Sequence, residues 1–250
     1  MTIVDHFKEF LGFLRYPSFD YKSDQPLNMR VVTIIYFMVF AIEMLLFIPV
    51  SSVLGIESMP HAMEAVMDDY TFFQVFILAV VIAPIAEELL FRLHLKYKPL
   101  IWLYFLIMLS SLFFLISGQA SVDLHSGPEI IINKLLQFAP FFASMVLIFL
   151  GYFLVPAIRN SIGSLVRSDF AAIFYITAWV FAFVHVFNFE LDSASWYLTP
   201  LLVLPQFILA LYLGYIRVRN TIFHSMYVHA LNNCIPLILL KIATSATGIQ

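Results

Sequence analysis

The sequence predicts an all-α, polytopic membrane helix bundle with about seven transmembrane helices and a short N-terminal interfacial helix. The first observation is composition, because 62% of the 250 residues are hydrophobic and only 12% are charged, unlike a typical soluble domain. The second is a series of apolar runs of spanning length, since about 20 residues are needed to cross a hydrocarbon core of about 30 Å. The third is that these runs lack the alternation of transmembrane barrel strands.

The elements follow in order along the chain. Residues 5–16 place several phenylalanine and leucine side chains near one helical face, which is typical of a short helix lying in the membrane interface. A polar stretch follows from Ser18 to Gln25. The seven apolar runs are Val31 to Leu54, Phe72 to Leu95, Leu100 to Gly118, Leu135 to Ile158, Phe170 to Phe189, Tyr197 to Ile216 and Thr221 to Ile242.

Lysine and arginine gather in alternate connections between these runs. The basic residues are Lys8, Arg15, Lys22 and Arg30, then Lys96 and Lys98, then Arg159 and Arg167, then Arg217 and Arg219. The opposite connections carry Glu57, Glu64, Asp68, Asp69, Asp123, Glu129, Glu190 and Asp192, with Lys134 as their one basic residue. Because cytoplasmic loops are enriched in lysine and arginine, we expect a cytoplasmic N-terminus and an external C-terminus.

Charge and cysteine content exclude several classes of function. The net charge of -3 and the pI near 6.1 give no basic surface for phosphates, so nucleic acid is not an expected partner. The single cysteine, Cys234, allows no intrachain disulfide and is interpreted as a packing residue. No secretory signal peptide is apparent, so the first run is expected to direct membrane insertion.

Polar residues inside the apolar runs indicate function, because an ionisable group near the bilayer centre costs about 2.5 to 3.5 kcal/mol. They are Glu43, Glu87, Glu88, Arg92, His94, His185, His224 and His229, with Gln74, Asn188, Gln206, Asn232 and Asn233. Glu88 and Arg92 are four residues apart and are expected to pair on one helical face. Glu87 lies about 100° around and stays available. The alternative is that the group caps the cytoplasmic end of its run, with Arg92 and Lys96 reaching headgroups.

Histidines mark two later runs. His185 interrupts an almost wholly apolar run, and the alternative interpretation is a packing histidine. His229 and Asn233 share a helical face and could hold one oxygen atom, whereas His224 is expected at the interface. Amide hydrolysis needs a base that activates water, an acid for the leaving nitrogen and donors for the oxyanion, and these runs contain all three.

These motifs resemble those of a known family. The segments "EELLFR" (Glu87, Glu88, Arg92), "FAFVH" (Phe181, His185) and "HALNN" (His229, Asn233) resemble the E-E-x-x-x-R, F-x-x-x-H and H-x-x-x-N motifs of the CAAX protease and bacteriocin-processing, or abortive-infection, family of intramembrane glutamic endopeptidases. Each motif is short, but their order within apolar runs is fairly specific. The resemblance covers roughly Phe72 to Ile242.

The resemblance implies a set of roles. Glu87 and His185 would activate the attacking water, His229 and Asn233 would stabilise the oxyanion, and Glu88 and Arg92 would orient the site. It implies no metal or other cofactor; zinc held by Glu87, His185 and His229 stays an alternative. The expected partners are the lipid bilayer and a membrane-embedded or lipidated peptide or protein substrate, and the expected location is a bacterial cytoplasmic membrane.

The resemblance also implies a domain organisation. We expect residues 1–30 to form a cytoplasmic segment with the interfacial helix, and residues 31–243 to form a protease-like helical domain with a helical hairpin inserted at about 99–158. The chain departs from the family at Leu93, where glycine is frequent, and in the 98 residues that separate Glu87 from His185. Because an even number of spans is inserted, the orientation of the His185 helix is kept.

Counting residues from the start of each span places His185 and His229 at different depths in the membrane. At about 1.5 Å per residue, His185 lies about 22 Å beyond Phe170, whereas His229 lies about 12 Å beyond Thr221. Tilt, kinks at Pro84 or Pro205, or a late start of the fifth span would reconcile these depths.

Other classes remain as alternatives. The chain lacks the H-E-x-x-H and G-x-S-x-G motifs and has no aspartate inside a run, which disfavours zinc, serine and aspartyl intramembrane proteases. A proton-coupled transporter would also place glutamate and histidine inside a bundle. A non-proteolytic immunity or scaffold protein of the same fold is the third alternative.

Overall fold

A computed structural model describes residues 1–21, 25–55, 70–96, 154–157, 160–161, 164, 168–189 and 196–247. Most of the described residues are helical, and the predicted fold class, a helical membrane bundle, is confirmed. Within the described part of the chain, three helical stretches are long and apolar enough to cross a membrane, Met29–Leu54, Phe72–Leu95 and Trp196–Arg219, and Phe170–Val184 is a shorter apolar helix. The predicted runs from Leu100 to Gly118 and, apart from residues 154–157, from Leu135 to Ile158 lie outside the described residues, so the count of seven stays a prediction.

The chain divides into two compact units. One contains Met1–Lys96 and Phe170–Gln250, and the other contains Tyr97–Asp169. All of the helices named below belong to the first unit. The predicted hairpin at about 99–158 falls within the second unit and lies almost wholly outside the described residues.

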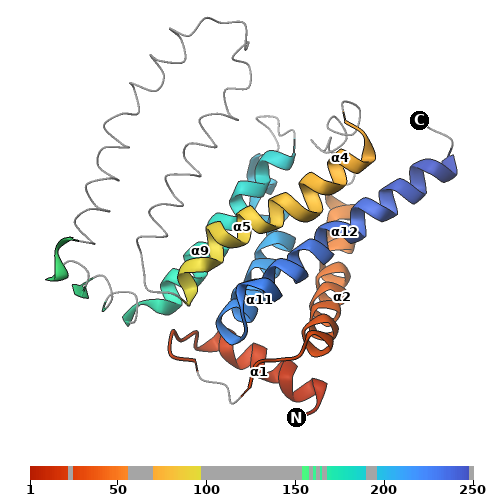
Figure 1. The fold of residues 1–250 in the computed structure, drawn as a ribbon. Coiled ribbons are helices and arrows are strands. Elements are labelled where there is room, and N and C mark those ends of the chain that lie inside the picture. Colours follow the sequence, from red (N-terminus) through yellow and green to blue (C-terminus); the bar gives the residue numbers. More distant parts are fainter. Residues whose placement is uncertain are drawn as a thin grey trace, which may run out of the picture. The chain divides into compact units, whose positions relative to one another are not determined.

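Figure 1 draws the helices of the first unit as coiled ribbons. They are α1 (Ile3–Arg15), α2 (Met29–Leu54), α4 (Phe72–Phe76), the π-helical turn η2 (Ile77–Ile82), α5 (Ala83–Arg92) with the 3-10 turn η3 (Leu93–Leu95), α9 (Phe170–Val184) with the 3-10 turn η4 (His185–Asn188), η5 (Trp196–Leu198), α10 (Thr199–Leu202), α11 (Leu204–Arg219) and α12 (Ile222–Thr247). The five predicted runs that the structure describes agree with these bounds to within a few residues. The fifth run changes helix type at His185, the sixth is divided between α10 and α11 at Val203, and α12 extends beyond Ile242.

Local side-chain caps set several helix starts. The Thr2 and Asp5 side chains form a capping box at the start of α1, and Thr71 and Gln74 form another at α4. The Asn28 side chain accepts a hydrogen bond from Val31 N at 2.9 Å at the start of α2. These bonds satisfy backbone N–H groups that have no partner inside the helix.

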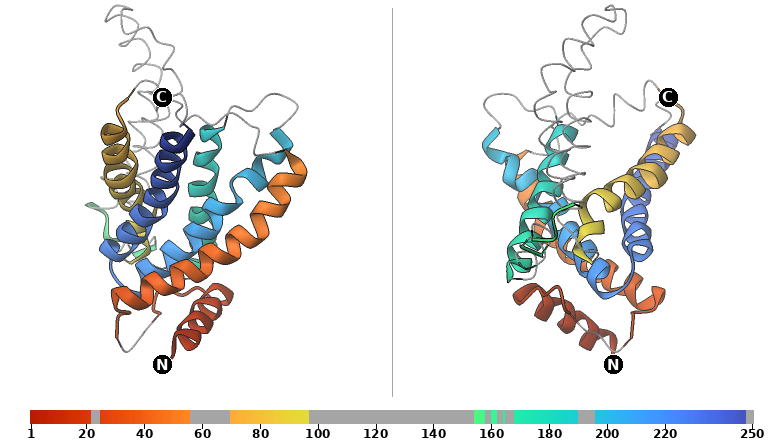
Figure 2. Two further views of the ribbon diagram at one scale, coloured as in Figure 1. Left: turned by 90° about the vertical axis from the view of Figure 1, so that its right-hand side faces the viewer. Right: turned by 60° about the vertical axis from the view of Figure 1, so that its left-hand side comes forward.

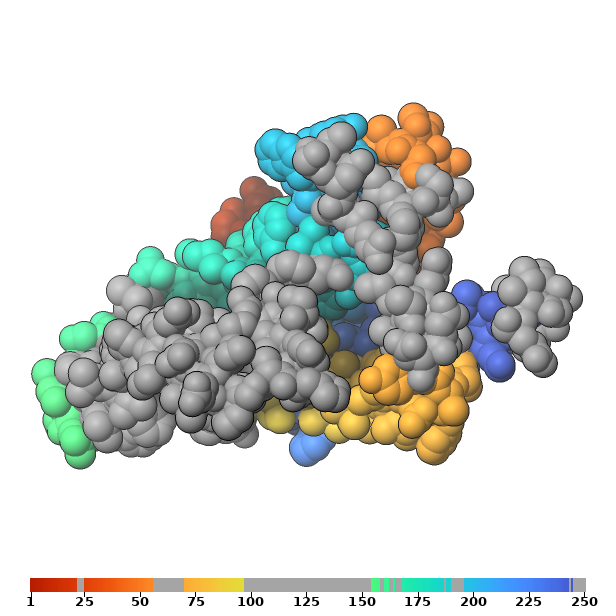
Figure 3. Space-filling model, turned by 90° about the horizontal axis from the view of Figure 1, so that it is seen from above, coloured from red at the N-terminus to blue at the C-terminus, as the bar shows by residue number. Residues whose placement is uncertain are grey.

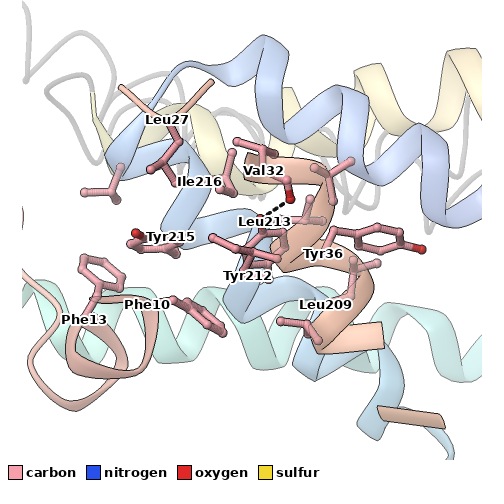
Figure 4. Packing of buried hydrophobic residues seen from close by; sticks show 14 of the residues in the cluster. Phe10, Phe13, Leu27, Val32, Tyr36, Leu209, Tyr212, Leu213, Tyr215 and Ile216 are labelled. Atoms are coloured by element: carbon pink, nitrogen blue, oxygen red, sulfur yellow. Dashed lines mark hydrogen bonds between the residues drawn. The ribbon is translucent and has the colours of Figure 1, made fainter. Parts of the chain in front are cut away.

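α11 is the centre of the bundle and packs against α1, α2, α9 and α12. Tyr212, Leu213, Tyr215 and Ile216 are fully buried there. Figure 4 shows the Tyr212 hydroxyl donating to the Val32 carbonyl oxygen, at 2.7 Å. The contacts of these buried aromatic and aliphatic side chains provide the main favourable free energy for packing α11 against its neighbouring helices.

α1 lies beneath the bundle, where α2 begins and α11 ends (Figure 2). Its Phe10 ring packs on Tyr212 and Tyr215, with centroids 5.3 and 5.2 Å apart. Glu9 accepts a hydrogen bond from the Tyr21 hydroxyl at 2.5 Å and pairs with Arg219 at 3.0 Å. Burial, together with the bond to Glu9, raises the pKa of Tyr21 above its usual range. The N-terminal helix is therefore held to the bundle by both apolar and charged contacts.

The segment that joins α11 to α12 forms hydrogen bonds with two other parts of the chain, at the end of the unit where α1 lies. The Asn220 side chain accepts from Leu27 N at 3.2 Å and donates to Leu27 O at 2.7 Å, ahead of α2. Lys96 Nζ donates to the Asn220 carbonyl oxygen at 2.6 Å. At the opposite end of the unit, Phe47 packs on Leu198 and Leu202, so the end of α2 lies beside residues 196–202 (Figure 3).

Gly214 lies where α11 packs closely against α9. A Cβ atom at this position would lie 2.6 Å from Cε2 of Phe174, a ring that is only 2% exposed. Gly214→Ala is therefore expected to lower the free energy of unfolding by about 1 to 3 kcal/mol, because the ring has no free space to move into.

The measurement is thermal unfolding of the purified protein in detergent, followed by circular dichroism. The matched control is Gly12→Ala in α1, where a Cβ atom would meet nothing within 4 Å and a gain of about 0.5 to 1 kcal/mol is expected. Equal unfolding temperatures for Gly214→Ala and the parent chain would contradict the packing.

Candidate active site

Three elements bring the predicted polar residues together. Glu87, Glu88 and Arg92 lie on α5, His185 begins η4, and His229 and Asn233 lie on α12. Glu87 Oε2 lies 3.7 Å from His185 Nε2 and 3.8 Å from His229 Nε2. Residues 98 and 142 positions apart in the chain thus converge on one carboxylate oxygen.

Helix packing resolves the difference in depth expected from counting residues. α5 and η2 pack along α12, and α5 also contacts α9 (Figure 1). The helix that carries Glu87 is not a uniform α-helix, because the π-helical turn η2 precedes it and Pro84 lies in its first turn. His185 lies where α9 changes to a 3-10 turn. Both changes alter the direction in which the following side chains project.

Glu88 is the most buried charged group of the site. Glu88 Oε1 lies 3.2 Å from Arg92 Nη1, as its spacing of four residues predicts, and 3.0 Å from His229 Nδ1. The side chains of Glu88, Arg92 and His229 are only 0, 2 and 1% exposed. Because Arg92 balances its charge, Glu88 serves as a carboxylate that accepts a hydrogen bond from His229 Nδ1.

Arg92 is buried rather than directed to headgroups, so the alternative of a capping arginine is wrong. Its guanidinium carbon lies 3.8 Å from the centroid of the Phe181 ring and 5.7 Å from that of Phe91. Phe181 also contacts the rings of His185 and His229, at centroid distances of 4.6 and 5.6 Å. One apolar ring thus packs against three polar groups of the site and stabilises the arginine through a cation–π contact.

A backbone contact fixes the orientation of His185. His185 Nδ1 lies 2.8 Å from the carbonyl oxygen of Phe181. A carbonyl oxygen only accepts hydrogen bonds, so Nδ1 carries a proton. In the neutral ring, Nε2 is then unprotonated, and it is the atom that faces Glu87.

Asn233 makes a different contact from the other site residues. Its Nδ2 donates to the carbonyl oxygen of Ala79 at 2.9 Å, within η2. An amide nitrogen has two protons, so one N–H stays available after this bond. His224 lies at the start of α12, where its Nδ1 contacts the Thr221 hydroxyl at 2.8 Å.

Sequence reasoning missed the contribution of Arg217. Arg217 Nε donates to the Arg92 carbonyl oxygen at 3.1 Å, Nη2 donates to the Leu93 carbonyl oxygen at 3.4 Å, and the residue is only 2% exposed. It therefore caps the end of α5, where carbonyl groups have no partner in the helix. Its position after an apolar run looks the same as that of an ordinary cytoplasmic arginine, so the sequence carries no signal for this contact.

Variants of the Glu88–Arg92 pair test its contribution to the stability of the protein. Glu88→Gln leaves the Arg92 charge buried without its partner and is expected to cost about 3 to 5 kcal/mol. The double variant Glu88→Gln/Arg92→Met removes both charges and is expected to recover most of this loss. Thermal unfolding in detergent measures both values.

Arg30→Met is the control, because Arg30 is an exposed arginine on α2 and its loss is expected to change stability by less than about 0.5 kcal/mol. The pairing would be disproved by a double variant that is as unstable as Glu88→Gln alone.

Comparison with known proteins gives one match. A search of curated proteins and a search of solved structures both returned no match. A scan against protein families matches residues 69–235 to the type II CAAX prenyl endopeptidase Rce1-like family. The matched segment is about two thirds of the chain and includes Glu87, His185, His229 and Asn233. Together with its apolar spanning helices, this makes the chain an integral membrane protein and a membrane endopeptidase that belongs to the Rce1-like type II CAAX prenyl endopeptidase family.

Proposed function

We propose that this endopeptidase hydrolyses a peptide bond of a membrane-associated peptide or protein with a water molecule activated by Glu87 and His185. The observation that carries the proposal is the convergence of two imidazole nitrogens on Glu87 Oε2, at 3.7 and 3.8 Å. Both distances are too long for a direct hydrogen bond. A water oxygen about 2.8 Å from Glu87 and from His185, the usual length of such hydrogen bonds, is proposed to bridge the two groups.

The orientation of His185 supports its role as a proton acceptor. Its Nδ1 proton is held by the Phe181 carbonyl oxygen, so Nε2 can accept a hydrogen bond from the attacking water. Glu87 Oε2, which has no hydrogen bond to the described residues, accepts the other proton. As the water oxygen attacks the carbonyl carbon, Glu87 takes that proton and then transfers it to the leaving nitrogen.

His229 and Asn233 are proposed to stabilise the oxyanion. His229 Nδ1 is held by Glu88, so a donor toward the substrate requires a second proton on Nε2. A doubly protonated His229 and Arg92 together carry two positive charges, which balance the charges of Glu87 and Glu88. The second N–H of Asn233 supplies the other donor. Donors that are held in place before the reaction contribute strongly to such catalysis, at about 3 to 4 kcal/mol for a single one.

The substrate is proposed to be lipidated or membrane-embedded. The matching family is named for endopeptidases of CAAX prenyl substrates, and the site lies among helices with exposed apolar faces. We propose a bacterial cytoplasmic membrane as the location. The lysine and arginine pattern supports an N-terminus in the cytoplasm.

The mechanism is proposed to be independent of metal. Glu87 and His185 are proposed to activate the water by themselves, so treatment of the purified protein with EDTA or phenanthroline is expected to leave the rate of peptide cleavage unchanged. A loss of activity that added zinc restores would favour the alternative in which Glu87, His185 and His229 bind zinc.

Glu87→Gln tests the catalytic assignment. This variant keeps the shape of the side chain but removes its basicity, so kcat is expected to fall by about 100-fold or more, the usual contribution of a general base. KM and the unfolding temperature are expected to change little, because Glu87 is not part of the buried Glu88–Arg92 pair. His185→Gln is expected to lower kcat in the same way.

The assay uses purified protein in lipid nanodiscs with three peptides: one with a prenylated C-terminal cysteine motif, the same peptide without the lipid, and a transmembrane peptide. Cleavage of the lipidated or transmembrane peptide, but not of the unlipidated one, is expected. Leu89→Ala, at a position of α5 that is 40% exposed, is the matched control and should retain activity. Cleavage by Glu87→Gln at the rate of the parent chain would overturn the proposal.

A further inference from the structure

Three polar residues of the spans have no part in the catalytic site, yet they line one cavity. Glu43 of α2, Gln206 of α11 and Asn232 of α12 surround a cavity of about 290 Å³. The remaining walls are apolar and include Phe40, Met44, Leu209 and Leu239. A cavity with mainly apolar walls and a few convergent polar groups has the composition of a small-molecule binding site.

Glu43 is the most unusual of these residues. It is 6% exposed, and no hydrogen-bond or ion-pair partner of its carboxyl group lies among the residues that the structure describes. A charged carboxylate buried without a counter-charge carries a large free-energy cost. The uncharged carboxyl group is the form that this setting accommodates.

The two amides present further hydrogen-bonding groups. Gln206 Oε1 is buried and has no hydrogen-bond partner among the described residues. Asn232 Oδ1 accepts a bond from the Tyr36 hydroxyl at 3.3 Å, and its Nδ2 carries two protons that can be donated. The cavity thus presents an acceptor from Gln206, a donor from Asn232 and a carboxyl group from Glu43.

The position of the cavity points to a ligand that is dissolved in the membrane. Glu43 lies 14 residues into the 26-residue helix α2, about 21 Å from its start at the usual helical rise. It is therefore near the middle of a span. A molecule at this depth exchanges with the hydrocarbon core, where charged groups are disfavoured.

We propose that this cavity binds an uncharged, mainly apolar membrane molecule that carries a hydroxyl group, such as a long-chain alcohol. A hydroxyl group donates one hydrogen bond and accepts two. It can donate to Gln206 Oε1 while it accepts from Asn232 Nδ2 and from the Glu43 carboxyl group, and the alkyl chain then contacts the apolar walls. One hydroxyl group can thus form a hydrogen bond with each of the three polar side chains.

The cavity is distinct from the catalytic site. Asn232 is next to Asn233 in α12, and successive helical residues project about 100° apart. Asn233 bonds to Ala79 of η2, whereas Asn232 bonds to Tyr36 of α2. Binding in the cavity therefore involves no residue of the proposed catalytic machinery, and its test does not depend on the proposed function.

The experiment is photolabelling of the purified full-length protein in nanodiscs with a long-chain primary alcohol that carries a diazirine, followed by mass spectrometry of the peptides. Labelling is expected on the segments of α2, α11 and α12 that line the cavity. Unlabelled alcohol should compete, and its methyl ether should compete at least about tenfold less well, because it cannot donate a hydrogen bond to Gln206.

Variants separate this ligand from other classes. Glu43→Gln keeps an uncharged hydrogen-bonding group and should label within about threefold of the parent, whereas Glu43→Leu and Gln206→Leu should label about tenfold less. Leu45→Ala, at a position of α2 that is 74% exposed, is the matched control and should label normally. Equal competition by the ether, equal labelling of Glu43→Leu, or a loss of labelling in Glu43→Gln, as a cationic ligand would give, each overturns the proposal.

Discussion

The ion pair between Glu88 and Arg92 is the interaction on which the rest of the site depends. Neither group is stable alone at its depth in the bundle, since both are almost fully buried and an unpaired charge there is costly. Paired, they give the apolar interior a fixed carboxylate that also holds Nδ1 of His229. The Glu88 carboxylate, whose charge Arg92 neutralises, thus fixes the orientation of the His229 ring.

A second layer of contacts keeps this pair in position. Arg217 caps the carbonyl groups of Arg92 and Leu93, and Asn220, a few residues later, connects the starts and ends of neighbouring helices through Leu27 and Lys96. The contacts at the end of α11 therefore fix the position of α5 relative to α2. The arginines of this end serve inside the protein, in addition to any effect they have on topology.

Local spacing explains what could be predicted from the sequence. The apolar runs predicted the helices because span length is a property of a single segment, and the Glu88–Arg92 pair followed from a separation of four residues. The contact between Glu88 and His229 joins residues 141 positions apart, so no local pattern specifies it. The bond from Asn233 to Ala79 depends on a backbone carbonyl in a π-helical turn, a feature that composition does not reveal. The capping by Arg217 was hidden for a similar reason, since its partners are main-chain atoms.

The π-helical turn η2 has a consequence for the phase of the helix that follows it. A π-helical turn accommodates an extra residue within a helix, and one residue corresponds to about 100° of rotation. The turn therefore sets the direction in which Glu87 and Glu88 project toward α9 and α12, whereas the pairing of Glu88 with Arg92 follows from their spacing within α5. In a chain shortened by one residue within Ile77–Ile82 and straightened to a regular α-helix, the two carboxylates would be rotated out of these directions, although every residue of the three motifs would still be present.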